Sequence, residues 1–486
     1  MRCLFILSLV GAIHESPLRQ ESYIAFLNLF PYNILSKALG SSLRQTHHLS
    51  VLFGNLINAI FTVTMKKHLI LPLVLLTLQF FCCRDKGTEP QPSSVQLIAE
   101  DVGVTEAWLR IKIIQNQQGG AVKINRDNQT FFLTQHAVMD TVILDDSLLP
   151  NHSYTYIAYR FSNNTPVDSS APLSLTTMDT TSHNFTWDIQ TIGVFQSSLN
   201  DVWGSSASDV WAVGSITDTT AGFFPNAAHF DGTHWTLVQI EEGFQIFGIF
   251  GFSSNNIYAV GTNGRVYHWN GINWGQQACL GIGDGCAGLL NGVPLTAVWG
   301  TSSNDLFVVG DSGVIVHYDG QTWTKMPSGT MLTMRDVWGF SSNDIYSAGA
   351  DFFGNTGILL HYNGVLWQKV SVDSVDTYRH FSVWGNQKRS VITTGDFTYL
   401  FNGNKWNKLS VPDQAILKFR IRGVSINNFF NTGSFGLVLH FNGITWHRYD
   451  ELASETNLVG VWSTNSEVYV VGRTNSLGVI VHGKTY

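Results

Sequence analysis

Apolar and polar residues alternate in short runs along most of this chain, and Gly, Asn, Asp or Ser separates the runs. One stretch, residues 298–323, shows the pattern in full. It predicts a strand over Leu295–Trp299, a turn at 302–304, a strand over Asp305–Val309, a third over Gly313–Tyr318 and a fourth around Trp323. We label these strands A, B, C and D.

Two halves of this stretch recur to the C-terminus. The first half has an aromatic residue, usually Trp-Gly, in strand A, and seven copies can be aligned. The positions of this residue are Trp203, Phe250, Trp299, Trp338, Trp384, Arg422 and Trp462. The second half is an Asx-Gly pair followed by Trp. The pairs begin at Asp231, Asn270, Asp319, Asn363, Asn402 and Asn442. Because Asx-Gly between apolar strands is typical of two-residue hairpins, we expect type I′ turns with positive φ at both residues.

The copies follow one another at intervals of 38 to 49 residues, within the range of four-stranded propeller blades. Seven A–B–C sets are present but only six C–D endings. Trp187 precedes the first set at the spacing of a closing Trp, so strand 185–189 is expected to complete the last blade. The fold class predicted for residues 183–486 is therefore all-β, a seven-bladed β-propeller closed by its own N-terminal strand.

These repeats resemble the Trp-Gly-rich propeller lipoproteins of bacteria, and more distantly the Asp-box propellers of sialidases. Asp319-Gly320 followed by Trp323 departs from the Asp-box, because Asp directly precedes Gly. The resemblance implies the fold and implies little about activity.

Residues 95–179 form a separate β-rich segment, with alternating strands at 108–113, 130–134 and 153–160. The run from Leu148 to Tyr154 resembles the corner that leads into strand F of a fibronectin type III domain. There the tyrosine hydroxyl bonds back to the turn, and Trp108 stands where that family keeps a strand-B tryptophan. The resemblance implies a β-sandwich that acts as a spacer.

The N-terminal part resembles a bacterial lipoprotein signal peptide. A basic start at Met65 precedes an apolar run from Leu69 to Phe81 that is too short to span a bilayer, and Cys82 and Cys83 follow. Residues 65–83 are thus expected to be a signal, with Cys82 or Cys83 lipidated, and 84–94 a linker. The residues before Cys82 depart from the usual lipobox, so ordinary secretion and a membrane-embedded or cytosolic N-terminus stay open. Translation starting at Met65 would leave 1–64 an extension of uncertain status.

Composition narrows the function classes. Charged residues are 13% of 486 and glycines number 45, which suits turn-rich β structure. A net charge of −7 excludes a general electrostatic case for nucleic acid, because phosphate binding needs clustered Lys and Arg. We expect a cell-envelope location, membrane contact through a lipid anchor only, and a monomer.

Recurrent polar residues favour structural roles. A histidine stands at one position of most repeats, but neighbouring blades are too far apart to share a metal. The Ser-Ser-Asn-Asp runs suit tight turns better than calcium. Cys279 and Cys286 share one long loop, which favours a disulfide in an exported protein. We predict no metal, no cofactor and no catalytic residue.

The large insertions all fall in B–C or D–A connections, which propeller geometry places on one face. Variable loops on a rigid scaffold are where binding usually resides. The candidate binding residues on these loops are Phe223, Phe224, Asp351, Phe352, Phe353, Tyr378 and Arg379. Arg422 is added because a charge on the innermost strand must reach the channel or find a partner.

The favoured hypothesis is a non-enzymatic binding or scaffold protein that contacts protein or glycan through this face. The alternative is a secreted propeller enzyme acting on polysaccharide, a glycosidase or lyase. Phe419–Arg422 is similar to a sialidase motif but lacks its proline. A structural subunit of an envelope complex is the third class.

Overall fold

The computed structural model describes residues 95–113, 121–134, 140–220, 222–373 and 378–485. The extension 1–64, the signal-like segment 65–83 with Cys82 and Cys83, and the linker 84–94 lie outside the described residues. In the described ranges, no helix is long and apolar enough to cross a membrane.

The first described part is a β-sandwich. One sheet has the order β1 (Val95–Val102), β2 (Ala107–Ile113), β5 (Asp140–Asp145). The other has the order β4 (Gln129–Leu133), β3 (Ala121–Arg126), β6 (Ser153–Ser162), β7 (Thr165–Ser169), and β8 (Leu173–Thr176) also pairs with β6. The inward residues of both sheets form one apolar core. The Tyr154 hydroxyl accepts a hydrogen bond from the Leu149 N–H at 2.9 Å, as expected for a tyrosine corner.

The second described part consists of seven four-stranded antiparallel sheets, numbered 1 to 7 in chain order. Their A strands are β10 (Ser198–Ser206), β14 (Ile246–Ser253), β18 (Leu295–Ser302), β22 (Met334–Ser341), β26 (His380–Gln387), β30 (Lys418–Ser425) and β34 (Asn457–Ser463). The B strands are β11 (Asp209–Ser215), β15 (Asn256–Gly261), β19 (Asp305–Gly310), β23 (Asp344–Asp351), β27 (Ser390–Gly395), β31 (Asn428–Gly433) and β35 (Glu467–Thr474).

The C strands are β12 (Ala227–Phe230), β16 (Arg265–Trp269), β20 (Ile315–Tyr318), β24 (Thr356–Tyr362), β28 (Thr398–Phe401), β32 (Val438–Phe441) and β36 (Leu477–Thr485). The D strands are β13 (Trp235–Val238), β17 (Trp274–Cys279), β21 (Trp323–Lys325), β25 (Trp367–Lys369), β29 (Trp406–Lys408), β33 (Trp446–Arg448) and, for sheet 7, β9 (Phe185–Ile192).

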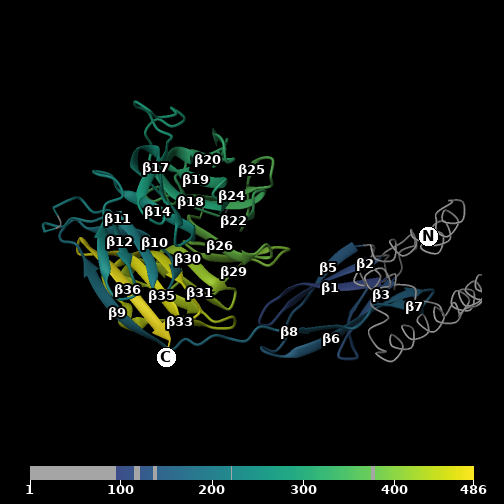
Figure 1. The fold of residues 1–486 in the computed structure, drawn as a ribbon. Coiled ribbons are helices and arrows are strands. Elements are labelled where there is room, and N and C mark those ends of the chain that lie inside the picture. Colours follow the sequence, from purple (N-terminus) through teal and green to yellow (C-terminus); the bar gives the residue numbers. More distant parts are fainter. Residues whose placement is uncertain (1–94, 114–120, 135–139, 221, 374–377, 486) are drawn as a thin grey trace, which may run out of the picture. The chain divides into compact units, whose positions relative to one another are not determined.

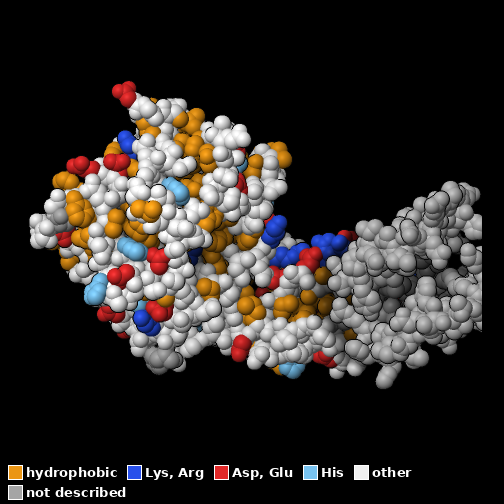
Figure 2. Space-filling view, in the orientation of Figure 1, with side chains coloured by type: hydrophobic (Ala, Val, Ile, Leu, Met, Phe, Trp, Pro, Cys, Tyr) orange, Lys and Arg blue, Asp and Glu red, His pale blue; other side chains and the backbone are white. Residues whose placement is uncertain are grey.

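The sheets form a closed ring, which defines a β-propeller. Each A strand contacts the A strand of the next sheet, and β34 contacts both β30 and β10. The A strands therefore form the innermost layer. In Figure 1 the blue strand β9 lies beside the yellow strand β36, so sheet 7 joins the first and last strands of the ring. On the face in Figure 2, charged side chains are scattered over the propeller among apolar and uncharged ones.

The Trp-Gly repeat joins neighbouring sheets. The indole of Trp203 lies against Gly251 of the next sheet, where an added Cβ would come within 2.6 Å of the ring. Trp299 lies in the same way against Gly339, with 2.7 Å to an added Cβ. The glycine is needed because any side chain there would push the indole out of the seam between two sheets.

The C–D turns differ from the sequence prediction. Two-residue type I′ turns were expected, but the loop in sheet 3 has four residues, and Tyr318 pairs with Trp323 across it. Gly320 has a positive φ of 89° and Asp319 does not. The Asp319 carboxylate instead accepts hydrogen bonds from the N–H groups of Gln321 and Thr322, at 2.9 and 2.7 Å. The prediction is wrong because an Asx side chain can close a wider turn by replacing a backbone acceptor.

Strand β9 should control the stability of the whole ring. We expect the double variant Gln190→Pro/Thr191→Pro to lower the free energy of unfolding by about 3 kcal/mol or more, because proline cannot donate to the ladder with β36. Gln190→Thr/Thr191→Val, which keeps both N–H groups, is the matched control. Urea unfolding followed by tryptophan fluorescence measures both, and equal midpoints for the two variants would contradict the closure role of β9.

Candidate functional site

The inner ends of the A strands form layered rings of side chains, one residue from each sheet in each layer. Two positions before the repeated aromatic residue, the ring consists of Asp201, Gly248, Ala297, Asp336, Ser382, Arg420 and Gly460. Three positions before it, the ring consists of Asn200, Phe247, Thr296, Arg335, Phe381, Phe419 and Val459. The first ring lies at the centre of the propeller, and the second lies at one opening of the central channel.

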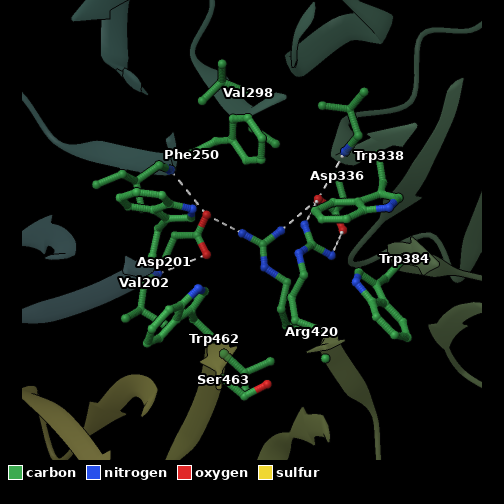
Figure 3. A pocket seen from close by; sticks show the side chains of 17 residues that line it. Asp201, Val202, Phe250, Val298, Asp336, Trp338, Trp384, Arg420, Trp462 and Ser463 are labelled. Carbon is green, nitrogen blue, oxygen red and sulfur yellow. Dashed lines mark hydrogen bonds and ion pairs between the residues drawn. The ribbon is translucent and has the colours of Figure 1, made fainter. Parts of the chain in front are cut away.

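Arg420 joins three sheets in the first ring. Its guanidinium forms ion pairs with Asp201 of sheet 1 and with Asp336 of sheet 4, the latter at 2.9 Å. In Figure 3 the Arg420 guanidinium lies between the two carboxylates. Both aspartates also accept backbone hydrogen bonds from the next sheet: Asp201 from the Ile249 N–H at 3.2 Å, and Asp336 from the Val383 N–H at 3.1 Å. These carboxylates therefore link neighbouring sheets as well as opposite ones.

Arg422 finds a partner at the centre. It donates two hydrogen bonds to the Asp336 carboxylate, from Nη1 at 2.9 Å and from Nη2 at 2.7 Å. Its guanidinium also lies 5.0 Å from the ring of Trp338. The arginine that replaces Trp in sheet 6 is thus a bidentate partner for a buried aspartate.

The four charges at the centre balance. Burial alone would raise the pKa of Asp336, but the charges of Arg422 and Arg420 outweigh it and hold this pKa below its ordinary value. Asp201 and Asp336 supply two negative charges, and the two arginines supply two positive ones. Buried charges need such pairing, because an unpaired ion in the interior costs several kcal/mol, ~3–5 when one partner is removed.

Beneath this network lies a cavity of about 130 Å³. Aromatic side chains from the A strands surround it, and Figure 3 shows Trp338, Trp384, Trp462 and Phe250 facing it from different sheets. It is a narrow space between packed indoles and the ion pairs, with room for a few water molecules.

A larger cavity of about 420 Å³ opens at the other side of Arg420. All seven members of the second ring line it. Strand A begins where strand B ends, as the pairing of Leu295 with Gly310 shows, so this opening lies on the face of the B–C and D–A loops. We call it the channel mouth.

Three phenylalanines form an aromatic platform on one side of the mouth. Phe352 stacks on Phe419 with ring centroids 6.4 Å apart, and Phe381 meets both edge-on. Arg379 positions this platform: it pairs with Asp396 at 2.6 Å and donates to the Phe352 carbonyl at 3.1 Å. Arg379 is therefore engaged in holding a loop, which leaves the aromatic surface to face the opening.

Two arginines at the mouth, Arg335 and Arg473, differ from Arg379 because their side chains have no partner among the described residues. Within the described part of the chain, the side chains of Arg335 and Arg473 form no ion pair and no hydrogen bond, and the Nε of Arg335 is buried without a partner. Burial lowers the pKa of Arg335, while the charges of Asp311 and Asp351 act in the opposite direction. None of the described residues that line the mouth is Asp or Glu.

The structure separates the binding residues predicted from sequence. Phe352 lines the mouth and Arg422 the inner cavity. Tyr378 and Arg379 line a different surface depression of about 580 Å³, where Tyr378 packs on Phe397. The remaining candidates, Phe223, Phe224 and Phe353 in loops and Asp351 at the end of β23, are exposed and lie outside both central cavities.

The repeated histidines have one structural role in six sheets. His317 stacks on Phe307 across the B–C pair, with centroids 4.2 Å apart, and its Nε2 donates to Asp305 at 2.7 Å. The other five are His229, His268, His361, His440 and His482, each with a matching stack and acceptor. In sheet 5, Leu400 and Ile392 replace the pair. Among the described residues, no three His, Cys, Asp or Glu side chains form a metal-binding group.

Cys279 and Cys286 form a disulfide in the D–A loop of sheet 2, with Cα atoms 4.6 Å apart. The loop packs inward through Leu280 and Leu290, which are buried in the seam between sheets 2 and 3. The disulfide fixes a long connection on the face of the B–C and D–A loops, and neither cysteine lines the mouth.

Sequence reasoning missed Asp201 and Asp336 at the centre, and Arg335, Phe381 and Arg473 at the mouth. It considered Phe419 and Arg420 only as part of the sialidase-like run 419–422 and not as site residues. The signal was present in the repeat alignment. Reading only the Trp column hides the columns two and three positions before it. The nearer of these has two acids and one arginine among Gly, Ala and Ser, and the farther has one arginine and three phenylalanines. Variation within a repeat column marks positions that the scaffold does not require.

The sheets and their closure define the protein as a β-propeller, a class that serves many functions. No family model matches the chain, and no curated protein matches it.

Solved structures of similar shape include "YCF48 bound to D1 peptide", 13% identical over 63% of this chain and 100% of that one, with a TM-score of 0.48. "YCF48 from Cyanidioschyzon merolae" is 12% identical over 61% of this chain and 98% of that one, at 0.46. The WD40 β-propeller domain of Doa1 is 13% identical over 61% and 96%, at 0.45. Likeness at this level assigns no ligand and no activity.

Removing Arg420 should destabilise the propeller strongly. Arg420→Met leaves Asp201 and Asp336 buried with too few partners, so we expect a loss of about 3–5 kcal/mol in the free energy of unfolding. Arg473→Met is the control, since Arg473 is exposed, and we expect a change within about 0.5 kcal/mol. Chemical denaturation measures both, and a loss below about 1 kcal/mol for Arg420→Met would contradict a structural role for this network.

His440 should make the protein sensitive to mild acid. Burial, and then the neighbouring His183 and His447, lower the pKa of His440 to about 3. Its Nε2 donates to Asn428, so its Nδ1 accepts from His183 at 2.8 Å, and a proton there would face another N–H. The unfolded chain takes up this proton near pH 6.5, but the folded chain does not. The contribution of His440 to the free energy of unfolding is therefore full above about pH 6.5 and falls by about 1.4 kcal/mol per pH unit below it.

Between about pH 7 and about pH 5, the free energy of unfolding of the wild type should therefore fall by about 2 kcal/mol more than that of His440→Gln. Urea titrations at both pH values measure the two losses. Parallel pH profiles for the two proteins would refute the assignment.

Proposed function

We propose that this protein is a non-enzymatic binding scaffold that holds a partner protein at the channel mouth. The observation that carries the proposal is the aromatic platform of Phe352, Phe381 and Phe419 at the opening of a cavity of about 420 Å³. Phe352 is 44% exposed although it packs on two other rings. Clustered aromatic residues in a concave site are typical anchors for protein contacts.

The charges of the site support binding over catalysis. Polysaccharide cleavage by a glycosidase uses a pair of carboxyl groups that reach the substrate, one as acid and one as base or nucleophile. The carboxylates of the channel, Asp201 and Asp336, are buried and engaged by arginines and backbone N–H groups. The low pKa of Asp336 also suits a fixed counter-ion better than a proton donor.

We also propose a domain organisation and a location for the chain. The seven sheets are proposed to be seven blades of one propeller, and residues 95–179 a fibronectin type III-like spacer. The order of the two sandwich sheets and the Tyr154–Leu149 hydrogen bond support the spacer. We propose that the chain is a monomer held at a bacterial cell envelope through lipidated Cys82 or Cys83, with the signal-like pattern of residues 65–83 as support.

Peptide selection and polysaccharide turnover test the proposed function together. The full chain is screened against a random peptide display library, and separately incubated with a polysaccharide panel while reducing ends are measured. We expect the library to yield peptides whose affinity falls about tenfold or more in Phe352→Ser, since burying a phenylalanine contributes ~1.5–3 kcal/mol. We expect no release of reducing ends.

Phe435→Ser is the matched control. Phe435 is 63% exposed in the B–C turn of sheet 6, on the same face but outside the mouth, and Ser312 occupies the same position in sheet 3 with a similar φ. Peptide affinity should be unchanged in this variant, and melting temperatures should match the wild type in both. Polysaccharide turnover that disappears when mouth residues are replaced would overturn the proposal in favour of the enzyme.

A further inference from the structure

The unpaired arginines give the channel mouth a definite charge preference. The side chains of Arg335 and Arg473 line the mouth with no ion pair or hydrogen bond to any described residue, and Arg420 forms its floor. Asp311 and Asp351 act on Arg335 through space but do not pair with it. An arginine can be neither deprotonated nor used as an acceptor, so a ligand that fills this site must bring negative charge or acceptors of its own.

The two arginines stand on opposite sides of the opening. Arg335 belongs to sheet 4 and Arg473 to sheet 7, which are three places apart in a ring of seven. The aromatic platform belongs to sheets 4, 5 and 6 and lies between them along the rim. A ligand that meets both arginines therefore crosses the apolar platform on its way.

We infer that the channel mouth binds an extended peptide segment of a partner protein in which two carboxylate side chains flank an apolar side chain. The apolar side chain packs against Phe352 and Phe419, and the carboxylates pair with Arg335 and Arg473. This inference rests on the proposed function and names the chemistry of the partner.

A peptide fits this lining better than a neutral sugar. Sugar hydroxyls both donate and accept, and the charged groups that line the mouth are donors only. A small inorganic anion would satisfy the arginines and leave the platform bare. Bidentate pairing of guanidinium with carboxylate, next to a desolvating aromatic surface, is a common basis of specific peptide recognition.

The test uses peptides selected on the full chain in low salt and measures their affinity by fluorescence polarisation. We expect the selected sequences to carry Asp or Glu on both sides of an apolar residue. The double variant Arg335→Gln/Arg473→Gln should weaken them by about a hundredfold, roughly tenfold for each charged pair. Lys325→Gln, an exposed lysine on the outer strand of sheet 3, is the charge control and should have no effect.

Amide versions of the same peptides complete a double-mutant cycle. If the carboxylates pair with the arginines, replacing Glu by Gln in the peptide weakens binding to the wild type and not to the double arginine variant. Affinity for the acidic peptides should also fall as salt is added.

The outcomes separate the inference from the proposed function. Peptides that need Phe352 but neither the arginines nor their own carboxylates would overturn the inference and leave the proposed function standing. A library that yields no peptide dependent on Phe352 would overturn both. Arginine-dependent binding of inorganic phosphate or of an acidic sugar, with no acidic peptide selected, would overturn the peptide assignment.

Discussion

The pairing of β9 with β36 is the constraint on which the rest of the propeller depends. It joins the first strand of the ring to the last, so β36 is paired on both sides and sheet 7 has four strands like the other sheets. Closure also fixes how closely the seven A strands approach one another. Only at that spacing do Asp201, Asp336 and Arg420 meet across the centre, although they lie far apart in the sequence.

The centre and the mouth use arginine for different purposes. At the centre, Arg420 and Arg422 form ion pairs with carboxylates, which makes the network neutral and holds sheets 1, 4 and 6 together. At the mouth, Arg335 and Arg473 face the cavity without carboxylate partners. Arginine thus stabilises the scaffold in the central layer, where carboxylates surround it. In the layer at the mouth, where no described carboxylate pairs with it, arginine is available to a ligand.

The repeat made the scaffold predictable. The Trp-Gly and Asx-Gly patterns placed the strands, and the spacing before Trp203 anticipated the closing strand, which extends to Ile192 in the structure. The turn geometry was not predictable in detail, because Asp319 closes its loop through a side-chain acceptor. Arg422 stood out in the sequence because it replaces the repeated Trp. Its bidentate partner Asp336 could not be predicted, because Asp336 belongs to another repeat and the sequence does not give the distance between the two.

By itself the sequence determined the class of fold, the order of the strands and the face that carries the variable loops. These properties follow from local patterns: alternation, turn residues and a repeat length. The tertiary structure decided which residues share a cavity and which charges are already paired. Arg379, a candidate in the sequence, is paired with Asp396, whereas Arg335 and Phe381 were not candidates and line the mouth only because the A strands meet there. Ligand sites depend on distances between sheets, and a one-dimensional pattern does not contain those distances.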